Sequence, residues 1–237
     1  MDGGALIIGR SVYKTYDTGR VKVEALRGVD IAVAKGEMVA VMGPSGCGKT
    51  TLLNCLSGLD DIESGTITIA GTDIAKMSDR EKTRYRATRM GFIFQSYNLL
   101  PVLTAQENVE LPLLVAGVRS REAREKALGA LEMVGLSDWR DHNPSELSGG
   151  QQQRVTIARS LVNEPEIVWG DEPTGNLDSE NSAEIMDLLC ELNATNGQTF
   201  VIVTHADDVA ARADRIVRMR DGLIVDDGIA TWTAGAQ

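Results

Sequence analysis

The sequence contains no hydrophobic run long enough to cross a bilayer, because no stretch approaches the roughly 18 consecutive apolar residues of a membrane helix. The opening Met1-Asp2-Gly3-Gly4 carries no basic segment, so we expect no secretory signal. These absences predict a cytoplasmic protein. If the protein works at a membrane, a second polypeptide must span that membrane.

Cysteines and basic residues are both in short supply. The chain has three cysteines, Cys47, Cys55 and Cys190, and an odd number without paired spacing argues against a disulfide framework or a zinc site. Lys and Arg number 24 against 34 Asp and Glu, which gives a net charge of −10. Because an acidic surface repels phosphate backbones, we expect no nucleic-acid partner.

Short apolar runs alternate with helical patterns within 237 residues, a length that can bury a sizeable core. Expected strands cover 37–42, 66–70, 91–94, 167–169 and 199–203. Expected helices cover 49–59, much of the region from 95 to about 161, and a segment that ends at Gly197. Within the middle region, Ser120 is expected to cap a helix that Gly135 ends. This order predicts an α/β protein with a mostly parallel sheet.

The octapeptide at 43–50, Gly-Pro-Ser-Gly-Cys-Gly-Lys-Thr, fits the phosphate-loop pattern G-x-x-x-x-G-K-[ST]. Its glycines allow backbone N–H groups to surround anionic oxygens at the start of the following helix. Lys49 is expected on the β- and γ-phosphates, and Thr50 on Mg²⁺. The alternative is a glycine-rich turn with an incidental lysine, which the flanking strand and helix disfavour.

An acidic pair, Asp171 and Glu172, closes the apolar run at 167–169. Asp171 is expected to reach a metal through water, and Glu172 is the candidate general base that takes a proton from the attacking water. An acidic pair at a strand end can also simply cap the next loop. The phosphate loop upstream and the continuation Pro-Thr-Gly-Asn-Leu-Asp at 173–178 favour the catalytic interpretation.

Between these two motifs stands Leu-Ser-Gly-Gly-Gln at 147–151, at the expected start of a helix. In this order the motifs resemble the ATP-binding cassette (ABC) ATPases, from about Tyr16 to about Gly228. The resemblance implies a phosphate-loop, RecA-like core of about 1–95 and 162–237, with an N-terminal antiparallel β portion. It also implies an inserted helical subdomain of about 96–161, all within one ATP-binding domain of residues 1–237. Trp169 and Gly170 depart from the family, which has smaller aliphatic residues there, so we expect local repacking around Trp169.

The resemblance also assigns site residues. Tyr16 would stack on adenine, with Tyr13 as the competing candidate, and the remaining ATP contacts would be Gly43, Pro44, Ser45, Gly46, Cys47, Gly48, Lys49, Thr50 and Thr51. Contacts to ATP held by the partner subunit would come from Ser148, Gly149, Gly150, Gln151 and Asp178. The implied catalytic residues are Gln95, Glu172 and His205, and those implied for Mg²⁺ are Thr50, Gln95 and Asp171. Taken alone, His205 could equally be a buried core histidine.

Three segments, 94–101, 107–113 and 171–178, look like the branch that serves lipoprotein release and macrolide export. The leading interpretation is therefore an ATPase that forms a homodimer around two ATP and drives a separate membrane permease on the inner face of the cell membrane. The permease would dock at the helical subdomain, which is entered at 97–101. The alternatives are an ABC ATPase of DNA repair or ribosomes, which usually has a coiled-coil insertion or two cassettes, and a small-molecule kinase or GTPase. The sequence lacks the guanine-reading Asn-Lys-x-Asp, and a kinase has no use for the Ser-Gly-Gly block.

Overall fold

The structure, a computed structural model, describes residues 4–17, 19 and 21–229. The chain divides into two compact units. The first unit comprises Met1–Lys82 and Leu192–Gln237, and the second unit comprises Thr83–Glu191. The second unit extends on both sides beyond the expected helical subdomain of 96–161, and the boundaries of that subdomain remain a prediction.

The first unit contains an antiparallel sheet in the order β2-β1-β4-β5. Its strands are β1 (Ala5–Asp17), β2 (Lys22–Ala34), β4 (Ser64–Ile69) and β5 (Thr72–Asp73). The buried side chains of these strands, among them Ile7, Val12, Leu26 and Ile67, are apolar. The expected N-terminal antiparallel portion is therefore confirmed.

The first unit also contains parallel strands. The strand β3 (Met38–Met42) pairs in parallel with β8 (Thr199–Val203) and β9 (Arg215–Arg220), while β10 (Leu223–Ile229) runs antiparallel to β9. Every residue of β3 and β8 is buried, as is typical of parallel strands that are covered on both faces. The short helix α7 (Asp207–Ala210) follows β8, and the 3₁₀ turn η1 (Ile74–Lys76) follows β5.

The helix α1 (Lys49–Leu56) follows β3 and the phosphate loop. The sequence predicted that this helix would continue to Leu59, and that prediction is wrong. Gly58 adopts a φ of 66°, outside the right-handed helical region, so the chain leaves the helix after Leu56.

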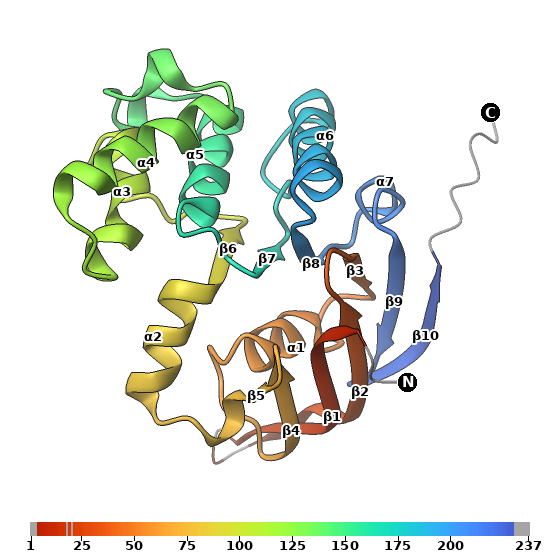
Figure 1. The fold of residues 1–237 in the computed structure, drawn as a ribbon. Coiled ribbons are helices and arrows are strands. Elements are labelled where there is room, and N and C mark those ends of the chain that lie inside the picture. Colours follow the sequence, from red (N-terminus) through yellow and green to blue (C-terminus); the bar gives the residue numbers. More distant parts are fainter. Residues whose placement is uncertain (1–3, 18, 20, 230–237) are drawn as a thin grey trace, which may run out of the picture. The chain divides into compact units, whose positions relative to one another are not determined.

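The second unit pairs two parallel strands, β6 (Met90–Phe94) and β7 (Ile167–Asp171), and adds a group of helices (Figure 1). The helices are α3 (Ala105–Val115), α4 (Ser120–Met133) and α5 (Gly149–Leu161), with the 3₁₀ turns η2 (Ser137–Trp139) and η3 (Pro144–Glu146). The helices α2 (Asp79–Arg89) and α6 (Ser179–Asn196) run from one unit into the other. Trp169, which departs from the family pattern, is completely buried.

The helix starts in the second unit differ in how they are capped. Thr104 and Glu107 form a reciprocal capping box at α3, and Ser148 and Gln151 form one at α5. The prediction that Ser120 caps α4 is wrong. Arg119 has the extended N-cap conformation and its carbonyl accepts the first helical hydrogen bond from Ala123, so Ser120 is already inside the helix.

An α/β fold with mostly parallel pairing in its central strands is confirmed by these registers. Within the residues that the structure describes, no helix is long and apolar enough to cross a membrane.

Candidate functional site

The phosphate loop lies at the carboxyl end of β3 in the first unit. Gly43 has a φ of 151°, and a Cβ atom there would collide with the Met219 carbonyl. The Lys49 ammonium donates to the Gly43 and Pro44 carbonyls at 2.8 and 3.1 Å, so it lies within the loop. Gly48, the N-cap of α1, offers no side-chain cap, which leaves the first-turn N–H groups of the helix for an anion.

His205 lies at the same sheet edge as this loop. Because Val41 of β3 pairs in parallel with Val203 of β8, the residues two positions later, Gly43 and His205, follow neighbouring strand ends. The His205 side chain is exposed, so it is not a buried core residue. Ligands of open α/β sheets bind at such carboxyl ends.

Tyr16 belongs to a hydrogen-bonded cluster with Lys14 and Asp60. Its hydroxyl donates to Asp60 Oδ2 at 2.7 Å, and Lys14 Nζ donates to Asp60 Oδ1 at 2.6 Å while lying 5.0 Å from the centroid of the Tyr16 ring. Burial opposes ionisation of Asp60, but the hydrogen bonds from Lys14 and Tyr16 outweigh it and hold the pKa of that carboxyl below its ordinary value. Burial also raises the pKa of Tyr16, an effect that a hydrogen bond from Thr51 of α1 opposes. Tyr16 therefore lies beside the helix that the phosphate loop begins.

Tyr13, the competing candidate for adenine, has different neighbours. Its hydroxyl lies only 2.6 Å from where a Cβ atom on Gly28 would stand, so Tyr13 packs on the backbone of β2. Of the two tyrosines, Tyr16 is therefore the one that contacts the helix after the phosphate loop, and its place at the adenine remains a prediction.

The acidic pair and the glutamine follow neighbouring strands of the second unit. Phe94 pairs in parallel with Asp171, so Gln95 and Glu172 come directly after adjacent strand ends. Glu172 is half-buried and has a φ of 49°, which is uncommon for a residue other than glycine. Backbone strain of this kind gathers at functional sites.

Gln95 is also clasped to the loop that follows Glu172. Gln95 Nε2 donates to Asn176 Oδ1 at 3.2 Å, and Asn176 Nδ2 donates back to the Gln95 carbonyl at 2.9 Å. A Cβ atom on Gly175 would stand 2.9 Å from Gln95 Nε2, so a larger residue there would push the Gln95 amide out of its present position. Sequence reasoning assigned no role to Asn176, because nothing in a single sequence shows that two amides 81 residues apart are partners.

The segment Leu-Ser-Gly-Gly-Gln at 147–151, called the signature loop below, lies at the start of α5. Ser148 is its exposed N-cap, and its hydroxyl accepts from the Gln151 N–H at 3.2 Å. Gly150 leaves room for the Asn181 side chain, and Asn181 Nδ2 donates to both carboxylate oxygens of Asp178 at 2.9 and 3.0 Å. The hydrogen bonds from the Asn181 N–H and side chain lower the pKa of Asp178. The structure thus brings Asp178 and the signature loop together through Asn181, which sequence reasoning missed.

The residues expected to hold Mg²⁺ come from both units, and each is described in its own unit. Thr50 is the second residue of α1 in the first unit, while Asp171 ends β7 and Gln95 directly follows β6 in the second. Hydroxyl, amide and carboxylate oxygens are the donors that Mg²⁺ prefers, and Mg²⁺ usually adds waters and substrate phosphates rather than a full protein cage. The chemistry of each of these donors therefore suits Mg²⁺. Among the described residues, no group of three or more His, Cys, Asp and Glu side chains could form another metal site.

A phosphate loop after β3, an acidic pair at the end of β7 and a glycine-rich start of α5 are the features of a phosphate-loop ATPase. Over residues 26–175 the sequence matches the family described as ABC transporter, and the chain belongs to that family. It is an ATP-hydrolysing, ATP-binding subunit of an ABC transporter.

Two relatives place the chain in the expected branch. It is 45% identical to the lipoprotein-releasing system ATP-binding protein LolD of Legionella pneumophila, over 92% of this chain and 96% of that protein. It is also 45% identical to the macrolide export ATP-binding/permease protein MacB of Brucella melitensis, over 96% of this chain and 35% of that longer protein. The predicted resemblance to the LolD and MacB branch is confirmed.

The fold is similar to that of the ATP-binding cassette MJ0796, solved as a dimer in a post-hydrolysis state with ADP and phosphate. The TM-score is 0.87 at 41% identity, and the match covers 95% of this chain and 99% of that one. The predicted fold class and the binding of ATP are supported by this similarity.

Proposed function

We propose that this chain hydrolyses ATP as a homodimer at the inner face of the cell membrane and drives a separate permease in lipoprotein release or a related export process. The observation that carries the proposal is the correspondence in extent with LolD, which this chain matches over 96% of that protein's length. MacB, by its name, joins the ATP-binding part to a permease, and this chain covers only the 35% of it that aligns.

Within one subunit, each proposed role follows from the chemistry of its side chain. Lys49, already hydrogen-bonded inside the loop, would neutralise the β- and γ-phosphates. Thr50, Gln95 and Asp171 would hold Mg²⁺, which on binding neutralises the charge that develops on the phosphate oxygens. Glu172 would take the proton of the attacking water. His205 would donate a hydrogen bond to the γ-phosphate.

The signature loop would act on the nucleotide of the partner subunit. The N-terminus of α5 carries a partial positive charge, and the exposed Ser148 with Gly149 and Gly150 offers donors to an anion. Asp178 is tied to this loop through Asn181 and would lie at the same dimer seam. The dimeric state of the cassette MJ0796 supports this arrangement.

The helical subdomain would bind the permease through exposed apolar side chains before α3. Leu100 and Val102 are 43% and 83% exposed, so two apolar side chains meet solvent two residues apart. The fully buried Asn108 fixes their loop, because its side chain bonds the N–H and carbonyl of Leu100 and the carbonyls of Leu103 and Thr104. A surface that is apolar, exposed and held in one conformation suits docking.

A test of this function is co-purification of the Glu172→Gln variant with ATP from detergent-solubilised membranes. We expect a protein with several membrane spans to accompany it, and Val102→Asp to release that protein. Met133→Asp, which changes a different exposed apolar residue of the second unit, serves as the control and should not release it.

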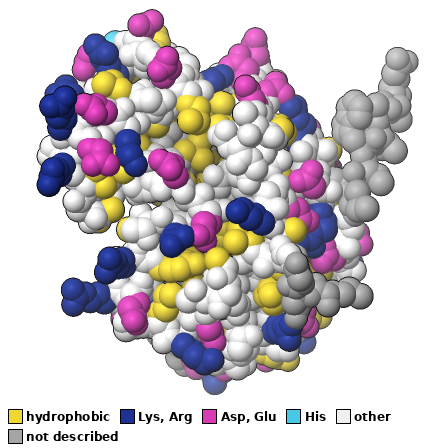
Figure 2. All heavy atoms as spheres, viewed as in Figure 1, with side chains coloured by type: hydrophobic (Ala, Val, Ile, Leu, Met, Phe, Trp, Pro, Cys, Tyr) yellow, Lys and Arg dark blue, Asp and Glu magenta, His cyan; other side chains and the backbone are white. Residues whose placement is uncertain are grey.

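Ribosomes or DNA in place of a membrane protein would contradict the proposal and favour a non-transport ATPase. On the face shown in Figure 2, the basic and acidic side chains of the described residues are interspersed.

A further inference from the structure

Two consecutive residues after β6 have left-handed backbone conformations. Tyr97 has a φ of 58° and Asn98 a φ of 51°, and neither is glycine. The Asn98 N–H donates to the Ser96 carbonyl at 2.5 Å, so the turn is tight. Left-handed conformations are unfavourable for residues with a Cβ atom and persist where neighbouring groups hold them.

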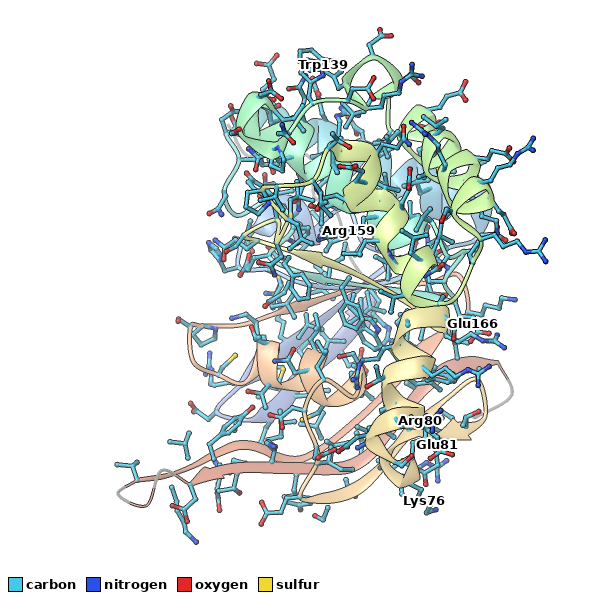
Figure 3. All side chains as sticks on the ribbon, turned by 90° about the vertical axis from the view of Figure 1, so that its left-hand side faces the viewer. Lys76, Arg80, Glu81, Trp139, Arg159 and Glu166 are labelled. Carbon is cyan, nitrogen blue, oxygen red and sulfur yellow. The ribbon has the colours of Figure 1, made fainter. Side chains whose placement is uncertain are left out.

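The guanidinium of Arg159 on α5, a residue labelled in Figure 3, holds this turn. Arg159 Nη1 donates to the Asn98 carbonyl at 2.6 Å, and Nη2 donates to the Tyr97 carbonyl at 2.8 Å. The Thr156 hydroxyl, one turn earlier, adds a bond of 3.2 Å to the Tyr97 carbonyl. Each left-handed residue thus has its carbonyl fixed by the same helix.

The partners of Arg159 are unusual for a guanidinium in this environment. Burial lowers the pKa of Arg159, and a desolvated guanidinium usually pairs with a carboxylate. Among the described residues, its hydrogen bonds go instead to these two backbone carbonyls. The charged guanidinium therefore stabilises the turn instead of neutralising a carboxylate.

The turn lies between two parts of the proposed catalytic machinery. On one side, the Tyr97 hydroxyl stands 3.0 Å from where a Cβ atom on Gly149 of the signature loop would be. On the other side, Gln95 is clasped by Asn176 in the loop after Glu172. A change in the turn would therefore have two effects at once. It would move the Tyr97 ring relative to Gly149, and it would change the direction of the Gln95 side chain.

We propose that Arg159 is a positioning residue for ATP hydrolysis. By holding Tyr97 and Asn98 in the left-handed conformation, it couples the position of Gln95 to that of the signature loop. When the guanidinium releases the two carbonyls, the turn relaxes and the coupling is lost. The inference rests on the proposed roles of Gln95 and the signature loop, and it adds a residue that touches neither nucleotide nor metal.

Arginine is needed because its planar fork reaches two carbonyls at once. Lysine carries the same charge but a single nitrogen, so Arg159→Lys keeps the charge and loses the bidentate contact. Arg159→Gln removes the charge as well. The matched control is Arg154→Lys on the same helix, where the guanidinium pairs with Glu184 at 2.9 Å and takes no part in the turn.

The experiment measures kcat, KM, ATP affinity by calorimetry and the unfolding midpoint for each full-length variant. We expect kcat to fall at least tenfold in Arg159→Lys and further in Arg159→Gln, with ATP affinity within twofold of the original protein. Arg154→Lys should keep its kcat within twofold.

Rescue distinguishes positioning from a merely structural role. Because glycine adopts positive φ without strain, Asn98→Gly should keep the turn in place without the guanidinium. Adding Asn98→Gly to Arg159→Gln should restore kcat at least threefold, while Asn98→Gly alone stays near the original rate. A structural role for Arg159 predicts instead that kcat follows the unfolding midpoint and is not rescued.

Two results would overturn the inference: a kcat within twofold of the original in Arg159→Lys, or no recovery in the double variant. Gln95→Ala and Ser148→Arg separate this failure from failure of the proposed function. If both of these hydrolyse ATP at the original rate, the proposed catalytic roles are wrong. If both are impaired while the Arg159 variants are not, only the present inference is wrong.

Discussion

Replacement of Glu172 tests the catalytic base and the backbone strain at once. Glu172→Gln keeps the size and the left-handed backbone but removes the base, so hydrolysis should fall about 100- to 10,000-fold. Stability should stay within about 0.5 kcal/mol, the usual range for a change that breaks no packing. ATP binding should survive, and an ATP-loaded dimer should accumulate.

Glu172→Gly separates the two properties. A left-handed residue with a Cβ atom costs about 1–2 kcal/mol, and glycine removes that cost. The greater freedom of glycine in the unfolded chain offsets about 0.5–1 kcal/mol of the gain. A net gain of about 0.5–1 kcal/mol corresponds to a rise of about 1–4 °C in the unfolding midpoint for a chain of this size. Hydrolysis should fall as far as in Glu172→Gln.

Glu164→Gly is the matched control for strain. Glu164 has a φ of 51° in the exposed turn before β7, and its ion pair with Lys126 is a long surface pair of 3.5 Å that contributes little. We expect a similar rise in the midpoint with unchanged hydrolysis. Calorimetric unfolding, phosphate release and size-exclusion chromatography with light scattering measure the three quantities. Hydrolysis at the original rate in Glu172→Gln would refute the role of the base, and no stabilisation in Glu172→Gly beside a stabilised Glu164→Gly would refute the strain argument.

Three further perturbations address the nucleotide, the dimer and pH. Lys49→Ala removes charge-assisted hydrogen bonds worth about 1.5–3 kcal/mol, so ATP affinity by calorimetry should fall about 10- to 100-fold; unchanged affinity in a folded variant would contradict the phosphate-loop assignment. Ser148→Arg should leave ATP binding by one subunit unchanged and block dimer closure. Mixing it with Lys49→Ala subunits should restore some hydrolysis through one intact composite site. A loss of ATP binding as large as that in Lys49→Ala would place Ser148 in its own subunit's site. Because the pKa of Asp60 is lowered, its contribution to stability is present above the ordinary carboxyl pKa and is lost as pH falls through the lowered value. Asp60→Asn should therefore flatten the acid limb of stability against pH, measured by chemical denaturation, and an unchanged limb would argue against the bonds from Lys14 and Tyr16.

Much of this protein could be predicted from local patterns. A phosphate loop uses backbone N–H groups that are contiguous in the chain, so the motif at 43–50 can be recognised from the sequence alone. The buried strands at 38–42 and 199–203 can also be predicted from the sequence, because parallel strands covered on both faces are continuous apolar runs. The start of α4 was misjudged by one residue, since the choice between Arg119 and Ser120 as cap depends on backbone geometry rather than on residue preference.

The sequence by itself determined the family, the α/β class and the order of the motifs, because each depends on neighbouring residues. Only the tertiary structure decided which distant groups meet: Lys14 and Tyr16 at Asp60, Gln95 at Asn176, and the Arg159 guanidinium at the Tyr97–Asn98 turn. Those pairings depend on strand register and on which face of a helix is turned inward. A single sequence carries neither, since a shift of one residue in register exchanges the side chains that meet without changing any local pattern.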